Sequence, residues 1–353
     1  MHLSFSFYLD GIRVLAALLV FFSHLKHQTN LSLPIYSYGH QAVVVFFVLS
    51  GLVIAFSTGK KKQQVKEYFI SRIARIYSVA IPAILLTIAF DTLGNSVSPL
   101  TYTEGYDAND IAAVRIPSSL LFLNELWFVS IQFFSNIPYW SLNYEVWYYI
   151  AFGVLVFSPR AYRIPLFFLV VLIAGIKIAL MLPIWLMGVG VWKCISKYPL
   201  QRFWLALPVF LGSLFGIVGF FATDLTGQLL SLEVEFLGAE FVKSLAYSKW
   251  FLADWCLGVL VALHFYSMQY FTRFIRKIPD GAVYCSRVIA DASFSLYLVH
   301  QPIILLLVSL LPIAKGDQYF TFTLLTLSLL SVSIFYYLTK SYPARIRTLL
   351  RKF

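Results

Sequence analysis

The chain has 353 residues, of which 60% are hydrophobic and only 12% are charged. Soluble domains average about 25% charged residues, so this composition excludes a soluble multi-domain protein and indicates an all-α polytopic membrane protein embedded in a lipid bilayer. The net charge of +11 is typical of basic cytoplasmic loops, and we expect no nucleic-acid partner. Three scattered cysteines form no CxxC pair, and we expect no metal.

Apolar stretches of about 20 residues recur along the whole chain. We predict ten spans, at 8–27, 41–57, 70–90, 141–157, 164–181, 183–197, 203–222, 247–266, 289–311 and 319–339. No basic leader with a small-residue cleavage site precedes the first stretch, so we expect it to remain as a span. The chain is expected to be a single membrane-embedded domain, residues 1–353, without a soluble accessory domain.

One further segment, 116–134, is long enough to span but contains Asn124, Glu125 and Gln132. If it does not cross and the N-terminus is cytoplasmic, the inner segments hold 20 Lys and Arg residues and the outer segments hold 5. An eleventh span would place basic loops outside. The positive-inside rule therefore favours ten spans with both termini cytoplasmic, and 116–134 is predicted to be re-entrant or interfacial.

The first span carries three ionisable residues, Asp10, Arg13 and His24. Arg13 and His24 are 11 residues apart, which places them about 20° from a common helix face and about 16 Å apart along it. Ionisable groups inside a membrane are candidates for function. Two simpler interpretations stay open: Arg13 snorkels to the inner interface and pairs with Asp10, and His24 is a hydrogen-bonded interfacial histidine.

The stretch "LDGIRVLAALLVFFSH" resembles the start of the acyltransferase-3 family of integral membrane O-acyltransferases, in which an arginine precedes a histidine at this spacing. Four further stretches resemble family elements in the family's order: "AVVVFFVLSGLVIAF", "YFISRIARIY", "WSLNYEVWYYI" and "SFSLYLVHQPI". The chain departs from the family at Ser71, where an arginine is frequent, at Ser78, where a proline is common, and at Val299 and Gln301, where tryptophans usually flank the histidine.

The resemblance implies transfer of an acyl group, usually acetyl, from a cytoplasmic acyl-coenzyme A to a hydroxyl on the other side of the membrane. It implies that His24 is catalytic, either by taking the proton of the hydroxyl or by transient acylation. Glu145 is the second catalytic candidate. The predicted spans place it at the depth of His24, where a carboxylate would orient the imidazole; a first-turn glutamate favoured by the helix dipole is the alternative.

The donor's phosphates are expected to bind Arg13, Arg72 and Arg75, because the guanidinium fork matches phosphate oxygens. Anchoring at the inner surface is the alternative for Arg72. Asp10 is expected to give structural support by setting the position of Arg13.

The acceptor is expected to dock from outside, between the loops 91–140 and 223–249. The substrate-binding candidates are Trp140, Tyr144, Tyr148 and His300. The aromatic residues could stack on a sugar ring, although packing in the interfacial belt is an alternative. His300 could contact the pantetheine arm or the acceptor, or be a buried, hydrogen-bonded histidine.

The sequence therefore predicts an O-acyltransferase of the bacterial cytoplasmic membrane that uses acetyl-CoA or another acyl-CoA. Its predicted acceptor is a cell-surface glycan, its lipid-linked precursor or a small hydroxyl compound. A membrane transporter whose ionisable residues line a substrate path is the alternative. Acetyl, succinyl and longer acyl groups, and the oligomeric state, stay open.

Overall fold

The computed structural model describes residues 2–29, 37–61, 64–102, 112–275, 277–313 and 317–352. Within these ranges every element is a helix, and a single isolated bridge joins Phe133 and Asn136. The α-helices are α1 Leu3–Leu25, α2 Gly39–Lys61, α3 Val65–Val97, α4 Pro99–Tyr102, α5 Ala112–Leu120, α6 Trp140–Phe157, α7 Arg160–Ala174, α8 Ile176–Lys197, α9 Phe203–Ala222, α10 Leu225–Leu237, α11 Ala239–Ser244, α12 Phe251–Phe271, α13 Asp280–Leu310, α14 Gln318–Thr339 and α15 Tyr342–Leu350. The prediction of an all-α protein is confirmed.

Eight of the described helical segments are long and apolar enough to cross a membrane. They are Leu3–Gln28, Gly39–Gly59, Val65–Val97, Ile176–Lys197, Phe203–Ala222, Phe251–Phe274, Asp280–Leu310 and Tyr319–Leu350. The chain is thus an integral, multi-pass membrane protein. The other two predicted spans correspond to α6 and α7, which have 18 and 15 residues; that they cross, and that both termini are cytoplasmic, stays a prediction.

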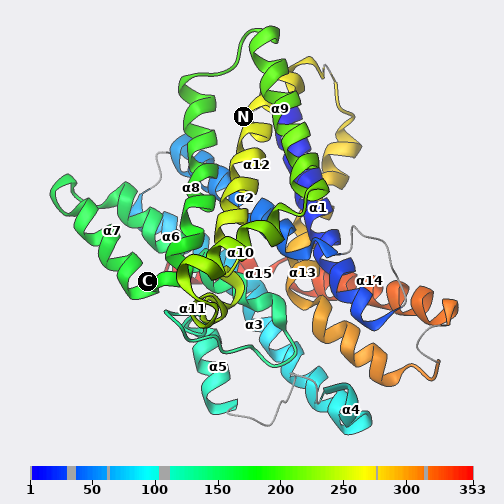
Figure 1. Ribbon diagram of the computed structural model, residues 1–353. Coiled ribbons are helices and arrows are strands. Elements are labelled where there is room, and N and C mark those ends of the chain that lie inside the picture. The colour runs from blue at the N-terminus through cyan, green and yellow to red at the C-terminus, as the bar shows by residue number, and fades with distance from the viewer. Residues whose placement is uncertain are drawn as a thin grey trace.

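The helices form a bundle in which elements distant in sequence are neighbours. Helix α2 packs on α8, α1 on α13, α13 on α3, and α12 on both α8 and α9. Figure 1 shows α8, α12 and α9 running alongside one another in its upper half, whereas α7 and α14 project on opposite sides. The buried core includes residues of α1, α2, α3, α6, α8, α12 and α13. Five of these helices, α1, α2, α3, α6 and α13, also supply residues of the candidate site.

Two glycines bring the backbones of α2 and α8 into direct contact. A Cβ on Gly51 would lie 2.0 Å from the carbonyl oxygen of Trp185, and a Cβ on Gly188 would lie 1.9 Å from that of Val48. Small residues permit this close approach between membrane helices. The contact fixes Ser50, next to Gly51, because the indole of Trp185 donates a hydrogen bond to the Ser50 hydroxyl at 3.2 Å.

The boundary between the fifth and sixth predicted spans is wrong. Helix α7 ends at Ala174 and α8 begins at Ile176, so Pro183, the first residue of the predicted sixth span, lies inside α8. Gly175 makes the break: its φ is +87°, and a Cβ there would lie 2.5 Å from the backbone of Trp127. A proline is tolerated within a membrane helix where neighbouring groups satisfy the freed carbonyl.

The predicted re-entrant or interfacial segment 116–134 is helical only up to Leu120, the end of α5, and the chain from 121 to 136 is irregular. Protein groups hydrogen bond to buried polar groups at its centre: the Ile131 amide donates to the Asn124 carbonyl at 2.8 Å, and the Asn143 side chain donates to that of Asn124 at 2.9 Å. Irregular backbone is tolerated at membrane depth only when protein covers it in this way. The segment joins α5 to the short helix Ile137–Tyr139 that precedes α6.

A buried ion pair fastens this segment to α8. Lys177 Nζ lies 2.6 Å from Glu125 Oε2, and both side chains are fully buried. The ammonium also donates to the carbonyl of Val129 at 2.5 Å, and the Ser130 hydroxyl donates to Glu125 at 2.9 Å. Each charge therefore has several partners, which a buried ion pair needs in order to offset its desolvation.

Candidate active site

Two cavities lie end to end along α1, α2, α6 and α13. The arginine cavity, about 80 Å³, is lined by Arg13, Arg72, Arg75, Ser50, Ser141, Glu145, Tyr149, Ser293, Phe294, Tyr297 and apolar residues of α2 and α6. The histidine cavity, about 450 Å³, is lined by His24, His27, His40, Val20, Ser23, Lys26, Ser37, Gly39, Val43, Ile137, Pro138, Trp140, Tyr247, Trp250 and Tyr297. Only Val43 and Tyr297 are common to both linings, so they form the layer between the cavities.

Helix geometry explains this stacking. On α1, Arg13 lines one cavity and His24, 11 residues later, lines the other. On α6, Trp140 lines the histidine cavity, whereas Ser141, Glu145 and Tyr149, spaced four residues apart, line the arginine cavity. Residues at that spacing share one helix face.

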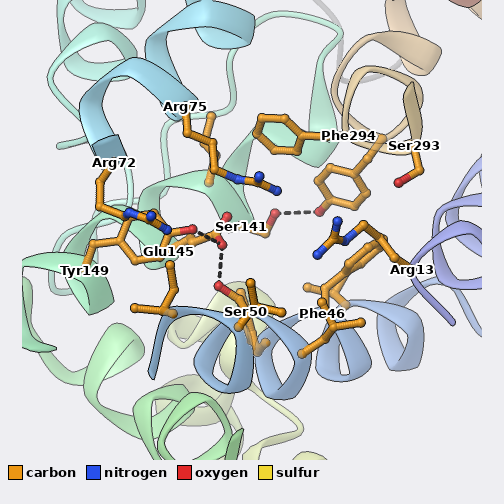
Figure 2. A pocket seen from close by; sticks show the side chains of 17 residues that line it. Arg13, Phe46, Ser50, Arg72, Arg75, Ser141, Glu145, Tyr149, Ser293 and Phe294 are labelled. Atoms are coloured by element: carbon orange, nitrogen blue, oxygen red, sulfur yellow. Dashed lines mark hydrogen bonds between the residues drawn. The ribbon is translucent and has the colours of Figure 1, made fainter. Parts of the chain in front are cut away.

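The arginine cavity combines three guanidinium groups with one carboxylate. The Arg13 Nη1 atom lies 3.9 Å from Oδ1 of Asp10, which is one turn earlier on α1. Asp10 is therefore placed where it could support Arg13, as expected from the sequence. In the described part of the chain, no carboxylate forms an ion pair with Arg72 or Arg75. Figure 2 shows Arg13 and Arg75 extending into the same space from opposite walls. The cavity therefore carries an excess of positive charge, which suits an anionic ligand.

Aromatic rings hold two of these arginines. The guanidinium of Arg72 lies 5.8 Å from the ring centre of Tyr149, and that of Arg75 lies 5.6 Å from the ring centre of Phe294. Cation–π contacts of this length orient a guanidinium without neutralising it. The Nε–H of Arg72 donates to the Ser71 hydroxyl at 3.2 Å, and its terminal N–H groups remain for a ligand.

Glu145 is held by hydroxyl groups. It accepts hydrogen bonds from Ser50 and from Tyr149, each at 2.5 Å (Figure 2). No hydrogen bond or ion pair joins Glu145 to His24 among the described residues, and the two line different cavities. The expected contact between them is therefore absent here, and Glu145 lies with the arginines instead.

His24 has a second imidazole as its neighbour. The ring centres of His24 and His300 are 5.1 Å apart. The Nδ1 atom of His300 lies 2.9 Å from the carbonyl oxygens of both Leu296 and Tyr297. Because a carbonyl can only accept, Nδ1 carries the proton and Nε2 of the neutral ring is an acceptor. This Nε2 atom is buried and has no hydrogen-bond partner in the structure.

The predicted acceptor contacts are only partly brought together. Trp140 lines the histidine cavity, but Tyr144, Tyr148 and His300 are fully buried and line neither cavity. The hydroxyl of Tyr144 hydrogen bonds with Ser248 at 2.9 Å, and that of Tyr148 donates to the Ile178 carbonyl at 3.3 Å. Both tyrosines fasten α6 to its neighbours, so this geometry does not support their assignment to the substrate.

Four lining or supporting residues were missed by the sequence analysis: Ser50, Tyr297, His40 and Asp254. Of these four, Asp254 had the clearest signal in the sequence. It is an acidic residue inside the predicted span 247–266, and ionisable residues inside a span are functional candidates. In the ranges that the structure describes, no group of three or more His, Cys, Asp or Glu side chains could hold a metal.

The sequence model of the acyltransferase domain matches residues 6–339, which includes every residue of both cavities. The chain belongs to the acyltransferase-3 family. As a family member it is a membrane acyltransferase, which favours catalysis over the transporter alternative. No curated protein and no solved structure matches the chain.

Proposed function

We propose that this acyltransferase-3 protein moves an acetyl group from acetyl-CoA to a hydroxyl of a cell-surface glycan or its lipid-linked precursor, in the cytoplasmic membrane of a bacterium. One observation carries the proposal: a cavity with three arginines lies directly against the cavity that His24 lines, and α1, α2, α6 and α13 contribute to both. A transferase with donor and acceptor on opposite sides of a membrane needs two such adjoining compartments.

The arginine cavity is the proposed donor site. Coenzyme A carries anionic phosphates, and arginine binds phosphate through paired N–H groups. The acyl-pantetheine arm would extend between the arginines that line this cavity, while the nucleotide would remain at its mouth. Arg72 and Arg75 lie about two to three turns after the start of α3 at Val65, and Arg13 faces them from α1.

The histidine cavity is the proposed acceptor side. Its walls include Pro138 from the predicted docking loop 91–140 and Tyr247 from the loop 223–249. His24 lies among them and is the proposed catalytic base. His300 Nε2, which has no hydrogen-bond partner in the structure, would accept the N–H of His24 through a bridging water. The second nitrogen of His24 then presents its lone pair to the acceptor.

The proposed reaction balances at these groups. The acceptor oxygen bonds to the thioester carbonyl carbon while its proton passes to His24. The carbon–sulfur bond breaks, and the proton returns to the departing thiolate. Transient acylation of His24 is the second route, and it needs the same nitrogen. In both routes the thioester passes the layer formed by Val43 and Tyr297.

Equilibrium binding of coenzyme A to the purified protein in nanodiscs tests this assignment. Arg75→Gln is expected to weaken binding about tenfold or more, because a charge-assisted hydrogen bond contributes about 1.5–3 kcal/mol. Arg163→Gln is the matched control, since Arg163 donates to the Ser158 carbonyl and lines neither cavity. Equal binding by both variants and the wild type would refute the donor site.

A further inference from the structure

A histidine and an aspartate outside the proposed machinery meet at the wall of the histidine cavity. His40 lies in the first turn of α2 and lines the cavity, and Asp254 lies in the first turn of α12 behind it. His40 Nε2 and Asp254 Oδ2 are 2.9 Å apart, and their side chains are 15% and 2% exposed. The residues are 214 positions apart in the sequence, so the packing of α2 on α12 creates the pair.

The pair fixes how His40 can act. With Asp254 ionised, its carboxylate can only accept, so Nε2 of His40 carries the proton and donates a hydrogen bond to Asp254. Nδ1 of the neutral ring is then an acceptor, and no partner is recorded for it among the described residues. Burying an ionised aspartate costs free energy unless the carboxylate is paired, and here the partner of Asp254 is His40. The hydrogen bond therefore holds the His40 ring, with Nδ1 as an acceptor, at the wall of the cavity.

The surrounding wall is aromatic. The rings of Trp140 and Tyr247 stack with centres 4.5 Å apart and planes 3° from parallel. The Trp250 ring lies 4.7 Å from that of His40, and the His40 ring is nearly parallel to Trp140 at 6.2 Å. Flat apolar faces beside a few fixed polar atoms form the kind of site that binds a ligand with an apolar face and a polar edge. A pyranose ring has that chemistry, because its C–H face is apolar and its edge carries hydroxyls.

We infer that the histidine cavity binds a pyranose ring of the acceptor, and that His40, oriented by Asp254, accepts a hydrogen bond from one of its hydroxyls. This inference rests on the proposed function and adds the residues that select the acceptor. His40 binds one hydroxyl while His24, on α1, takes the proton from the hydroxyl that reacts. The distance between the two imidazoles then decides which hydroxyl of the sugar is acylated.

The test uses protein in nanodiscs and measures the KM for the acceptor separately from the binding of coenzyme A. Labelled acetyl-CoA is supplied with the methyl glycosides of glucose, galactose, rhamnose and N-acetylglucosamine, and with 1-butanol as a hydroxyl without a sugar ring. His40→Phe is expected to raise the KM for the accepted glycoside at least tenfold, as for a lost hydrogen bond in a buried site. Coenzyme A binding should stay within twofold. Asp254→Asn, which keeps the shape but not the charge, should raise the same KM about threefold.

His264→Gln is the matched control. His264 also lies on α12, is near Ser213 Oγ at 3.2 Å, and lines neither cavity, so its parameters should equal those of the wild type. Monodisperse elution of each variant establishes that it has folded.

An unchanged acceptor KM in His40→Phe would overturn the inference, as would equal use of 1-butanol and glycosides. Donor binding without transfer to any glycoside would overturn the sugar class and leave the donor site intact. Failure to bind coenzyme A would instead refute the proposed function.

Discussion

Glu145 and His24 line different cavities, and Tyr297 lies in the layer between those cavities. Glu145 accepts hydrogen bonds from Ser50 and Tyr149 beside three arginines, whereas His24 lies against His300. In the proposed mechanism, a carboxylate in that position would balance the positive charge of the arginine cavity. It would not act on the imidazole of His24, which lines the other cavity.

Glu145→Gln is therefore expected to change the KM for acetyl-CoA and to leave the pH profile of kcat unchanged. Glutamine still accepts hydrogen bonds from both hydroxyls, but the cavity loses its negative charge. Donor KM should fall about fivefold, corresponding to about 1 kcal/mol for one charge in a partly hydrated site. Steady-state kinetics at varied acetyl-CoA measures this. A shift in the pH profile of kcat, with donor KM unchanged, would show that Glu145 acts on His24 after all.

Tyr297 is expected to keep the two compartments separate. Its hydroxyl lies 2.5 Å from that of Ser141 and 3.3 Å from the carbonyl of Pro138, which holds the ring in the layer between the cavities. Tyr297→Ala would remove the ring and connect the cavities. We expect faster release of coenzyme A from acetyl-CoA in the absence of acceptor, because water would reach the thioester.

The matched control for this variant is Tyr297→Phe, which keeps the ring and loses only the hydroxyl. It should stay close to the wild type in release without acceptor and lose no more than about tenfold in transfer, the size of one hydrogen bond. Thiol release, followed with a chromogenic disulfide, measures both variants. Equal release from Tyr297→Ala and the wild type would show that the ring does not separate the compartments.

The pair of Lys177 and Glu125 is expected to dominate the stability of the 121–136 segment. Lys177→Met leaves a fully buried carboxylate without its ammonium partner, which destabilises by about 3–5 kcal/mol. Thermal unfolding of the purified protein in detergent should show a clear fall in the midpoint. Lys193→Met, at an exposed position of the same helix, should leave the midpoint within a degree or two of the wild type.

Adding Glu125→Leu to Lys177→Met tests the cause. The double variant removes both charges and should recover part of the loss, because the uncompensated carboxylate is gone. A double variant that is as unstable as the sum of two independent losses would argue that the residues act separately.

The sequence predicted those features that depend on one helix at a time. The 11-residue spacing of Arg13 and His24 placed them on one face at two depths, and they line the two cavities. The three-residue spacing of Arg72 and Arg75 likewise brought both into one cavity. The polar residues of 116–134, together with the distribution of Lys and Arg over the loops, predicted that this segment does not cross, and the structure is irregular from 121 to 136.

Features that depend on how helices pack against one another could not be predicted. The depth of Glu145 relative to His24 depends on where α6 begins beside α1. Of the α6 residues, Trp140 alone lines the histidine cavity. Which of the tyrosines near Glu145 faces a cavity depends on the neighbouring helices, and Tyr149 does while Tyr144 and Tyr148 do not. The pair of His40 and Asp254 joins two helices that are far apart in the sequence.

The measurement that tests the account most directly is transfer of labelled acetyl from acetyl-CoA by purified protein in nanodiscs, with coenzyme A binding measured on the same samples. We expect His24→Ala to bind coenzyme A as the wild type does and to lose transfer about 10²–10⁴-fold, the usual contribution of a general base. Arg13→Gln should instead lose binding. Full transfer activity in His24→Ala, at a normal level of folded protein, would contradict the assignment of His24 as the catalytic residue.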